Sequence, residues 1–188
     1  MLFYLIPPSS FGDRPIDESL SPLFKILKKG FIRGVAVISS TGVFSEFDGA
    51  VVNHSTTVIG TSSRVQRLLE IENAWLASPF QVAIVRLAGL YGNSRIIGAR
   101  LLEGERSLPG DGNEYINLIH GYDAARAVLK LLQNQFFGEK FLVTDGNPVK
   151  RKVYYNYLAS RLGVRKPKFS GKKRNSYQCD SSETWRRL

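Results

Sequence analysis

Residues 34–42 read Gly-Val-Ala-Val-Ile-Ser-Ser-Thr-Gly, and this stretch decides the fold. It begins with apolar side chains that show no polar alternation, a pattern typical of a strand buried on both faces of a parallel sheet. It ends in small polar residues that stop the strand. Because α/β sheets bind ligands at the carboxyl ends of their strands, Ser40 is a candidate site residue.

Similar apolar runs occur before and after this strand, and each is bounded by turn residues. The runs cover 2–6 (stopped by Pro7 and Pro8), 81–87 and 141–144. Amphipathic segments that predict helices alternate with them, at about 22–29, 63–76, 122–133 and 150–162. We expect Ser21 to cap the first helix, with Pro22 at its first position, and Ser62 or Ser63 to cap the second. The alternation predicts a parallel α/β sheet with right-handed crossovers.

Composition favours a soluble globular protein over a disordered one. The chain has 188 residues, of which 43% are hydrophobic and 11% aromatic. No run approaches the roughly 20 apolar residues that span a bilayer, and the first residues lack the features of a secretory signal. The single cysteine, Cys179, excludes an internal disulfide. We therefore expect a cytoplasmic protein without a membrane partner.

The net charge of +10 is concentrated near the carboxyl end. Residues 1–149 carry 14 basic and 14 acidic side chains, whereas 150–188 carry 12 basic side chains against Asp180 and Glu183. A basic tail attracts anionic partners such as nucleic acid. The alternative is a solvated terminal segment, and the tail has neither zinc-finger spacing nor an RNA-recognition signature. Nucleic acid is therefore not the expected partner.

Four segments, in the expected order, resemble the extended short-chain dehydrogenase/reductase superfamily, and within it the NAD-dependent epimerase/dehydratase group. They are 37–44 (VISSTGVF), 86–92 (RLAGLYG), 117–127 (NLIHGYDAARA) and 141–149 (FLVTDGNPV). In that family they correspond to the strand that delivers a catalytic Ser or Thr, the segment beside the nicotinamide, a motif that closes the substrate region, and a strand followed by a turn.

The resemblance implies a partial Rossmann-like parallel sheet with flanking helices and a small C-terminal substrate-type region. It covers residues 1–165, followed by a basic tail at 166–188. The family's glycine-rich phosphate loop, G-x-x-G-x-x-G or G-x-G-x-x-G, does not occur in the sequence. The strand at 2–6 resembles the family's fourth strand. We therefore expect an atypical, N-terminally truncated member that lacks the first strand–helix units.

The proton-transfer residues of the family are replaced in this sequence. In the family a Ser or Thr orients the substrate oxygen, and a Tyr transfers a proton with help from a Lys one helical turn later. Ser40 matches the first position, whereas Arg64 and Leu68 occupy the Tyr and Lys positions. Arginine is no general base near neutral pH, because its pKa exceeds about 12. None of the eight tyrosines has a lysine four residues later.

Each of these positions also has a simpler interpretation. Ser40 is the expected catalytic residue by position, but a serine there also caps turns by bonding nearby backbone. Arg64 and Arg67 are suited to clamp a phosphate or carboxylate, and the alternative is an exposed helical face with Glu70 nearby for pairing.

The resemblance implies NAD or NADP as the cofactor and a sugar nucleotide or similar small molecule as the substrate. The implied cofactor-binding residues are Pro7, Pro8, Ser39, Leu87, Ala88 and Gly89. The implied substrate-binding residues are Thr41, Tyr91, Arg95, Arg100 and His120. No metal site is expected, because His54 has no second candidate ligand near it in the sequence.

Three hypotheses follow for function. The first is an epimerase/dehydratase-like protein of the oxidoreductase family that is weak or inactive alone and does not bind NAD(P) tightly, because the pyrophosphate lacks its loop. The second is a non-catalytic binding module whose apolar strand at 2–6 forms an open sheet edge, paired with a complementing chain or with a second copy. The third is binding of anions or nucleic acid through the basic tail.

Overall fold

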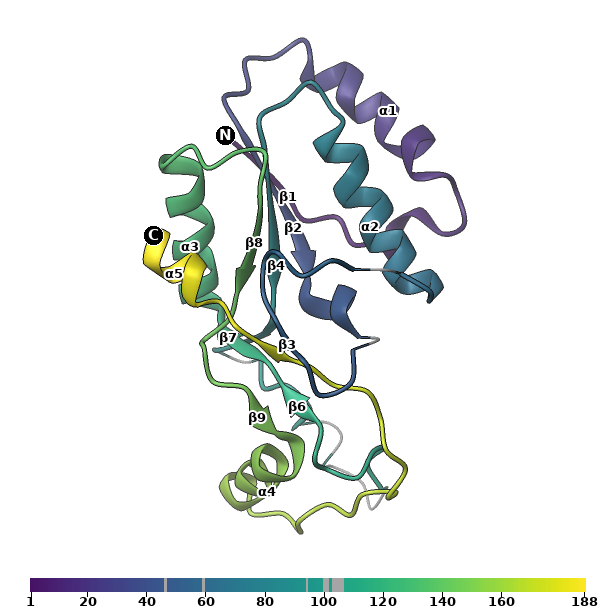
Figure 1. Ribbon diagram of the computed structural model, residues 1–188, viewed down its shortest axis with the longest axis vertical. Coiled ribbons are helices and arrows are strands. Elements are labelled where there is room, and N and C mark those ends of the chain that lie inside the picture. Colours follow the sequence, from purple (N-terminus) through teal and green to yellow (C-terminus); the bar gives the residue numbers. More distant parts are fainter. Residues whose placement is uncertain (46, 59, 94, 100–101, 103–106) are drawn as a thin grey trace.

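A computed structural model describes residues 1–188 apart from 46, 59, 94, 100–101 and 103–106. Its central sheet has four parallel strands in the order β1-β2-β4-β8 (Figure 1). The strands are β1 (Leu2–Tyr4), β2 (Val35–Ser40), β4 (Val82–Leu87) and β8 (Lys140–Val143). The four strands expected from the apolar runs are confirmed, although β1 ends at Tyr4 and not at residue 6.

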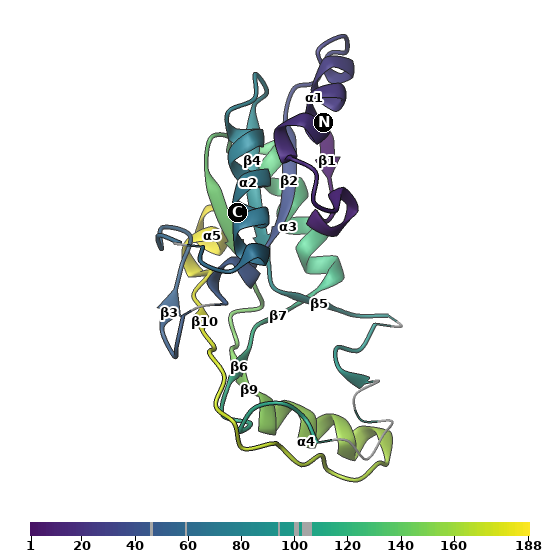
Figure 2. The ribbon, with the colours of Figure 1, turned by 90° about the vertical axis from the view of Figure 1, so that its right-hand side faces the viewer.

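Helices cover both faces of this sheet, so its central strands are buried on both sides. Helices α1 (Ile16–Leu27) and α2 (Ser63–Leu76) pack on one face against Val35, Val37 and Ile84. Helix α3 (Gly121–Gln133) packs on the other face against Ala36, Ala83 and Val85. Figures 1 and 2 show the sheet between these two layers. The continuous apolar runs in the sequence reflect this double coverage.

The predicted start of α1 was wrong. The helix begins at Ile16, and Pro22 lies inside it on the exposed side. Asp17 and Glu18 occupy the first turn, where negative charge interacts favourably with the amino end of a helix. Burial of Ile16 in the core then holds this added turn in place. The second helix begins as expected, since the Ser62 side chain accepts a hydrogen bond from the Val65 amide at 3.4 Å.

A smaller region lies beyond the carboxyl ends of the sheet strands, with α4 at the bottom of Figure 1. It holds two short strand pairs in addition to α4. The elements are β5 (Gly89–Tyr91) with β7 (Leu118–His120), β6 (Tyr115–Ile116) with β9 (Val149–Lys150), and α4 (Arg151–Leu162). Short 3-10 turns follow β1 and β2, as η1 (Pro8–Phe11) and η2 (Thr41–Phe44).

The segment 166–188, expected as a basic tail, runs back along the molecule to the sheet. Phe169 bridges to Leu108, and β10 (Gln178–Cys179) pairs with β3 (Val51–Val52). Helix α5 (Ser182–Arg187) then contacts β8, where the Trp185 indole donates to the Thr144 carbonyl at 2.8 Å. The charged side chains of this segment are therefore carried by a backbone with defined contacts.

A charged network ties the helices to the sheet from within the core. The Glu72 carboxylate of α2 is fully buried and accepts two hydrogen bonds from the Arg86 guanidinium of β4, at 2.7 and 3.0 Å. The Ser39 hydroxyl of β2 donates to the same carboxylate at 2.6 Å. Arg86 also lies over the Phe44 ring, 5.3 Å from its centre. The charges are thus paired and bonded, as burial requires.

Within the described part of the chain, no helix combines the length and apolar character that a membrane crossing requires.

Candidate ligand-binding site

A cavity of about 800 Å³ lies where the sheet strands end at their carboxyl termini. Its walls come from the segment that follows β1, from the last residues of β2, from the end of β4 and the residues after it, and from one side of α2. The lining residues discussed in the sequence are Pro7, Pro8, Ser39, Ser40, Arg64, Leu68, Leu87, Ala88, Gly89 and Arg95. The structure thus brings all six expected cofactor-binding residues together with Ser40, Arg64 and Leu68.

A second cavity of about 450 Å³ adjoins the first. The two share Ser40, Arg64 and Gly89 in their linings, so these residues lie at the junction. The second cavity also contains Thr41, one of the expected substrate-binding residues. The rest of its wall comes from the turn after β2, from Ile97, from residues 114–117 and 174–177, and from α4.

Ser40 is the last residue of β2 and caps the short turn η2. Its hydroxyl oxygen accepts a hydrogen bond from the Gly42 amide at 3.0 Å. This bond uses an acceptor position and leaves the hydroxyl proton free to donate. Ser40 therefore fulfils the turn-capping interpretation and still offers a donor at the junction of the cavities.

Arg64 lies in the first turn of α2, one turn before Leu68. Leu68 is buried, whereas Arg64 is exposed. A Cβ atom added at Gly42 would lie 3.9 Å from Arg64 Nη2, so the guanidinium lies beside the turn that Ser40 caps. Arg67, by contrast, pairs with Glu70 at 3.1 Å and donates to the carbonyls of Gly12 and Arg14. The two arginines therefore do not form a joint clamp.

The structure places Tyr91 and His120 in a contact of their own, outside the linings of these two cavities. Their rings lie 5.4 Å apart, edge to face. His120 Nδ1 accepts from the Tyr122 amide at 3.3 Å and so caps α3. Gly92 has a positive φ, and a side chain there would collide with His120. Arg100 lies outside the described residues.

Ser39 lines the first cavity, but its hydroxyl is committed to the buried Glu72 carboxylate. His54 is a half-buried loop residue whose ring nitrogen Nε2 lies 3.0 Å from the Ser55 hydroxyl. Among the described residues, no group of three or more His, Cys, Asp and Glu side chains is placed to hold a metal ion.

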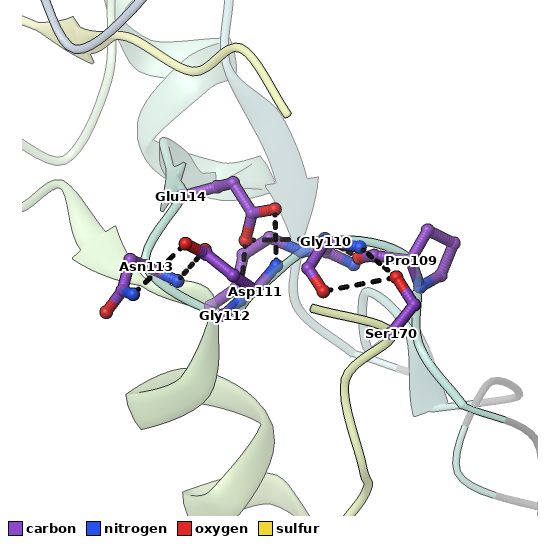
Figure 3. A network of polar contacts seen from close by, with 8 residues as sticks. Pro109, Gly110, Asp111, Gly112, Asn113, Glu114 and Ser170 are labelled. Atoms are coloured by element: carbon purple, nitrogen blue, oxygen red, sulfur yellow. Dashed lines mark hydrogen bonds and ion pairs between the residues drawn. The ribbon is translucent and has the colours of Figure 1, made fainter. Parts of the chain in front are cut away.

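Sequence reasoning missed a carboxylate, Glu114, in the wall of the second cavity. Its oxygens accept from the amides of Asp111 and Gly112, at 3.1 and 2.9 Å (Figure 3). Its Oε2 also lies 3.7 Å from the Arg151 guanidinium. Gly110 approaches this carboxylate so closely that a side chain there would collide with it. The charge of Glu114 is therefore balanced inside the wall, and Arg151 is its partner.

Sequence reasoning also missed Tyr177, which lines the second cavity from the C-terminal segment. The Asn117 side chain holds this segment, since it donates to the Tyr177 carbonyl at 2.9 Å and accepts from the Cys179 amide at 2.8 Å. The Tyr177 hydroxyl bonds to Thr41 Oγ1 at 3.3 Å, and burial raises its pKa to about 12. A phenol with that pKa is a poor proton donor near neutrality.

No family model matches the chain. In sequence it is similar to Protein YeeZ of Escherichia coli K12, with 33% identity over 133 residues, which is 70% of this chain and 47% of that protein. The chain therefore spans about half the length of the curated relatives it matches.

Solved structures match almost the whole chain. The putative NAD-dependent epimerase/dehydratase of Methylobacillus flagellatus has a TM-score of 0.80 at 24% identity, over 98% of this chain and 68% of that one. The dTDP-glucose 4,6-dehydratase of Bacillus anthracis, solved with NAD, has a TM-score of 0.79 at 14% identity, over 99% of this chain and 65% of that one. The chain therefore has the Rossmann-like fold of the NAD-dependent epimerases and dehydratases, over about two thirds of the length of these structures.

Proposed function

We propose that the chain forms the ligand-binding part of an NAD(P)-dependent epimerase/dehydratase-like protein whose substrate is a sugar nucleotide or a similar small molecule. By itself it is a weak or inactive catalyst. One observation carries the proposal: Ser40 lines the same cavity as Arg64 and Leu68, which stand where the resembling family has its proton-transferring Tyr and its Lys. The site is kept, and the proton-transfer pair is replaced.

The cavity suits part of the cofactor. Its volume lies within the range of about 300–1,000 Å³ for small-molecule sites, and Leu87, Ala88 and Gly89 offer an apolar wall for the nicotinamide end of NAD(P). When bound, that group supplies hydride transfer. The sequence has no glycine-rich loop that would bind the pyrophosphate. We therefore expect weak dinucleotide binding by this chain alone.

Titration of the intact chain tests this proposal. NADPH and NADH, followed by fluorescence, are expected to bind with dissociation constants of about 0.1 mM or weaker. Calorimetry with dTDP-glucose is expected to detect binding that Ser40→Tyr abolishes, because the larger side chain fills the junction of the cavities. Ser160→Tyr makes the same change on the exposed face of α4 and is expected to bind like the parent.

Two results would count against the proposal. Equal binding of dTDP-glucose by the parent and by Ser40→Tyr would show that the ligand does not bind at the junction of the cavities. Micromolar binding of NADPH would contradict the expectation of weak cofactor binding. Turnover at a rate typical of enzymes, about 1 s⁻¹ or more, would contradict the expectation of weak or absent catalysis.

The edge of the sheet supports a second proposal, that β1 pairs with a complementing chain or with a second copy. Within the described chain β1 pairs only with β2, and Phe3, Leu5 and Ile6 are exposed. Exposed apolar edge strands favour pairing with another strand. Light scattering after size exclusion is expected to show self-association that Leu5→Lys reduces, and a monomer at every concentration would contradict the homo-oligomer.

A further inference from the structure

We propose that Arg64 and Ser40 together bind an oxyanion, the carboxylate or phosphate group of a ligand that enters the two adjoining cavities. This inference rests on the proposed function, because it names a chemical feature of the ligand for the same site. It assigns to Arg64 a binding role where the resembling family places a proton-transferring residue.

The first argument is position. Arg64, Ser40 and Gly89 are the residues common to both cavity linings, so a ligand that extends from one cavity into the other passes them. The guanidinium lies beside the turn at Gly42, which Ser40 caps. Arg64 also lies close enough to Tyr177 for its positive charge to lower the pKa of that phenol, against the larger opposing effect of burial.

The second argument is that Arg64 has no carboxylate partner among the described residues. Arg67, Arg86, Arg151 and Arg187 each pair with a glutamate, at 2.7–3.7 Å. Arg64 makes no such pair within the part of the chain that the structure covers. A cation without a partner in a cavity wall is available to an anion from outside.

The third argument is the charge of the surrounding wall. Among the described lining residues, the further charged side chains are Arg95 in the first cavity and Glu114, Arg151 and Arg174 in the second. Glu114 is neutralised by Arg151 and by two backbone amides. The remaining charge is positive, so the wall attracts an anionic group and disfavours a cationic one.

The fourth argument is donor chemistry. A guanidinium has five N–H donors and no acceptor, and its planar fork matches the oxygens of carboxylates and phosphates. The Ser40 hydroxyl adds its proton as a further donor, because its bond from the Gly42 amide uses only an acceptor position of the oxygen. The pair therefore offers mainly donors to a ligand, and an oxyanion, which only accepts hydrogen bonds, suits them best. Because arginine keeps its charge at any ordinary pH, this arrangement binds and orients but does not transfer a proton.

Calorimetric titration of the intact chain at low salt with inorganic phosphate, and separately with succinate, tests the inference and distinguishes the two sources of oxyanion. We expect at least one probe to bind. Arg64→Gln is expected to weaken that binding about tenfold or more, and Ser40→Ala by a smaller factor. Arg64→Lys keeps the charge but loses the fork, so its affinity is expected to lie between those of the parent and of Arg64→Gln.

Arg161→Gln is the matched control, since it removes the same charge from an exposed position on α4 outside both cavity linings. Its affinity is expected to equal that of the parent. Equal losses of affinity in Arg64→Gln and Arg161→Gln would show that only the net charge of the chain matters, and would overturn the inference. Absence of binding of both probes to the parent, up to tens of millimolar, would overturn it as well.

The same variants separate this inference from the proposed function. If phosphate or succinate binds through Arg64 while dTDP-glucose and NADPH do not bind, the proposed function fails and the oxyanion site stands. If dTDP-glucose binds to the parent and to Arg64→Gln equally well, the proposed function stands and the role of Arg64 fails.

Discussion

Helix α2 carries two charged side chains, Arg64 and Glu72, in opposite environments. Glu72 is fully buried and accepts hydrogen bonds from Arg86 and Ser39. Arg64, about two turns earlier, lines the cavities and has no carboxylate partner among the described residues. A charge in the core is tolerated only when protein groups satisfy it, whereas an unpaired charge in a cavity wall can be satisfied by a ligand.

The largest expected effect concerns the buried side of this comparison. Glu72→Ala leaves the Arg86 guanidinium buried without a partner, so we expect the free energy of unfolding to fall by about 3–5 kcal/mol. Urea titration followed by circular dichroism measures this change. Glu70→Ala removes an exposed partner of Arg67 on the same helix and is expected to cost about 1 kcal/mol or less. Similar losses in both variants would contradict the comparison.

The C-terminal segment that frames the second cavity can be tested through Cys179, the single cysteine. Burial raises the pKa of its thiol to about 12, and its strand pairs with β3. We expect iodoacetamide at pH 8 to react about 100-fold more slowly with the folded chain than with the chain in urea, which corresponds to about 2.7 kcal/mol of local opening. Equal rates would show that the segment opens freely and that Tyr177 does not form a fixed wall.

The cavity side of the comparison can be tested by placing at positions 64 and 68 the Tyr–Lys pair that the family resemblance leads us to expect there. Arg64→Tyr combined with Leu68→Lys puts a phenol and an ammonium group one helical turn apart beside the cavity. The nearby cation favours the phenolate, so we expect the pKa of the new phenol to be about 1 unit lower than in the single variant Arg64→Tyr. Ultraviolet difference titration against the parent measures it. An equal pKa in both variants would show that the two positions do not interact.

The smallest expected effect concerns an exposed ion pair. The hydrogen bond from Arg187 lowers the pKa of the Glu139 carboxyl. A carboxyl whose pKa is lower in the folded state contributes stability above its unfolded pKa, about 4.3, and loses this contribution as the pH falls through the folded pKa. Arg187→Gln is therefore expected to cost less than about 1 kcal/mol at pH 7, and less still in acid.

The control for this pair is Arg161→Gln, which changes charge without removing a described carboxylate partner. Its stability relative to the parent is expected to show no matching loss near pH 4. A pH-independent remainder in Arg187→Gln would report the contacts of Arg187 with the rings of Phe136 and Phe141.

Local sequence patterns predicted the strands and helices correctly where a segment carried a single structural signal. The apolar runs at 34–39 and 81–87 predicted the buried parallel strands β2 and β4, and a cap at Ser62 or Ser63 predicted the start of α2. At α1 two local features competed. Pro22 suggested a first helical position, but the acidic first turn and the buried Ile16 start the helix earlier. Side-chain burial decided between them, and that is a property of the packed molecule.

The candidate site was partly predictable for the same reason. Residues at the ends of buried strands, such as Ser40 and Gly89, converge because parallel strands end at one edge of a sheet. Tyr177 is held at the site by a hydrogen bond that the Asn117 side chain, 60 residues earlier, donates to its carbonyl, and nothing in the local sequence of either residue indicates that contact.

The sequence by itself determined the order of the main strands and helices along the chain, the absence of a glycine-rich loop and the absence of a tyrosine with a lysine four residues later, because each depends on residue types at short spacing. Only the tertiary structure decided which charges are satisfied. Glu114 is balanced by Arg151, Glu72 by Arg86, and Arg64 is left at the junction of two cavities. Pairing of charges depends on distances between elements far apart in the chain, and packing of the whole molecule sets those distances.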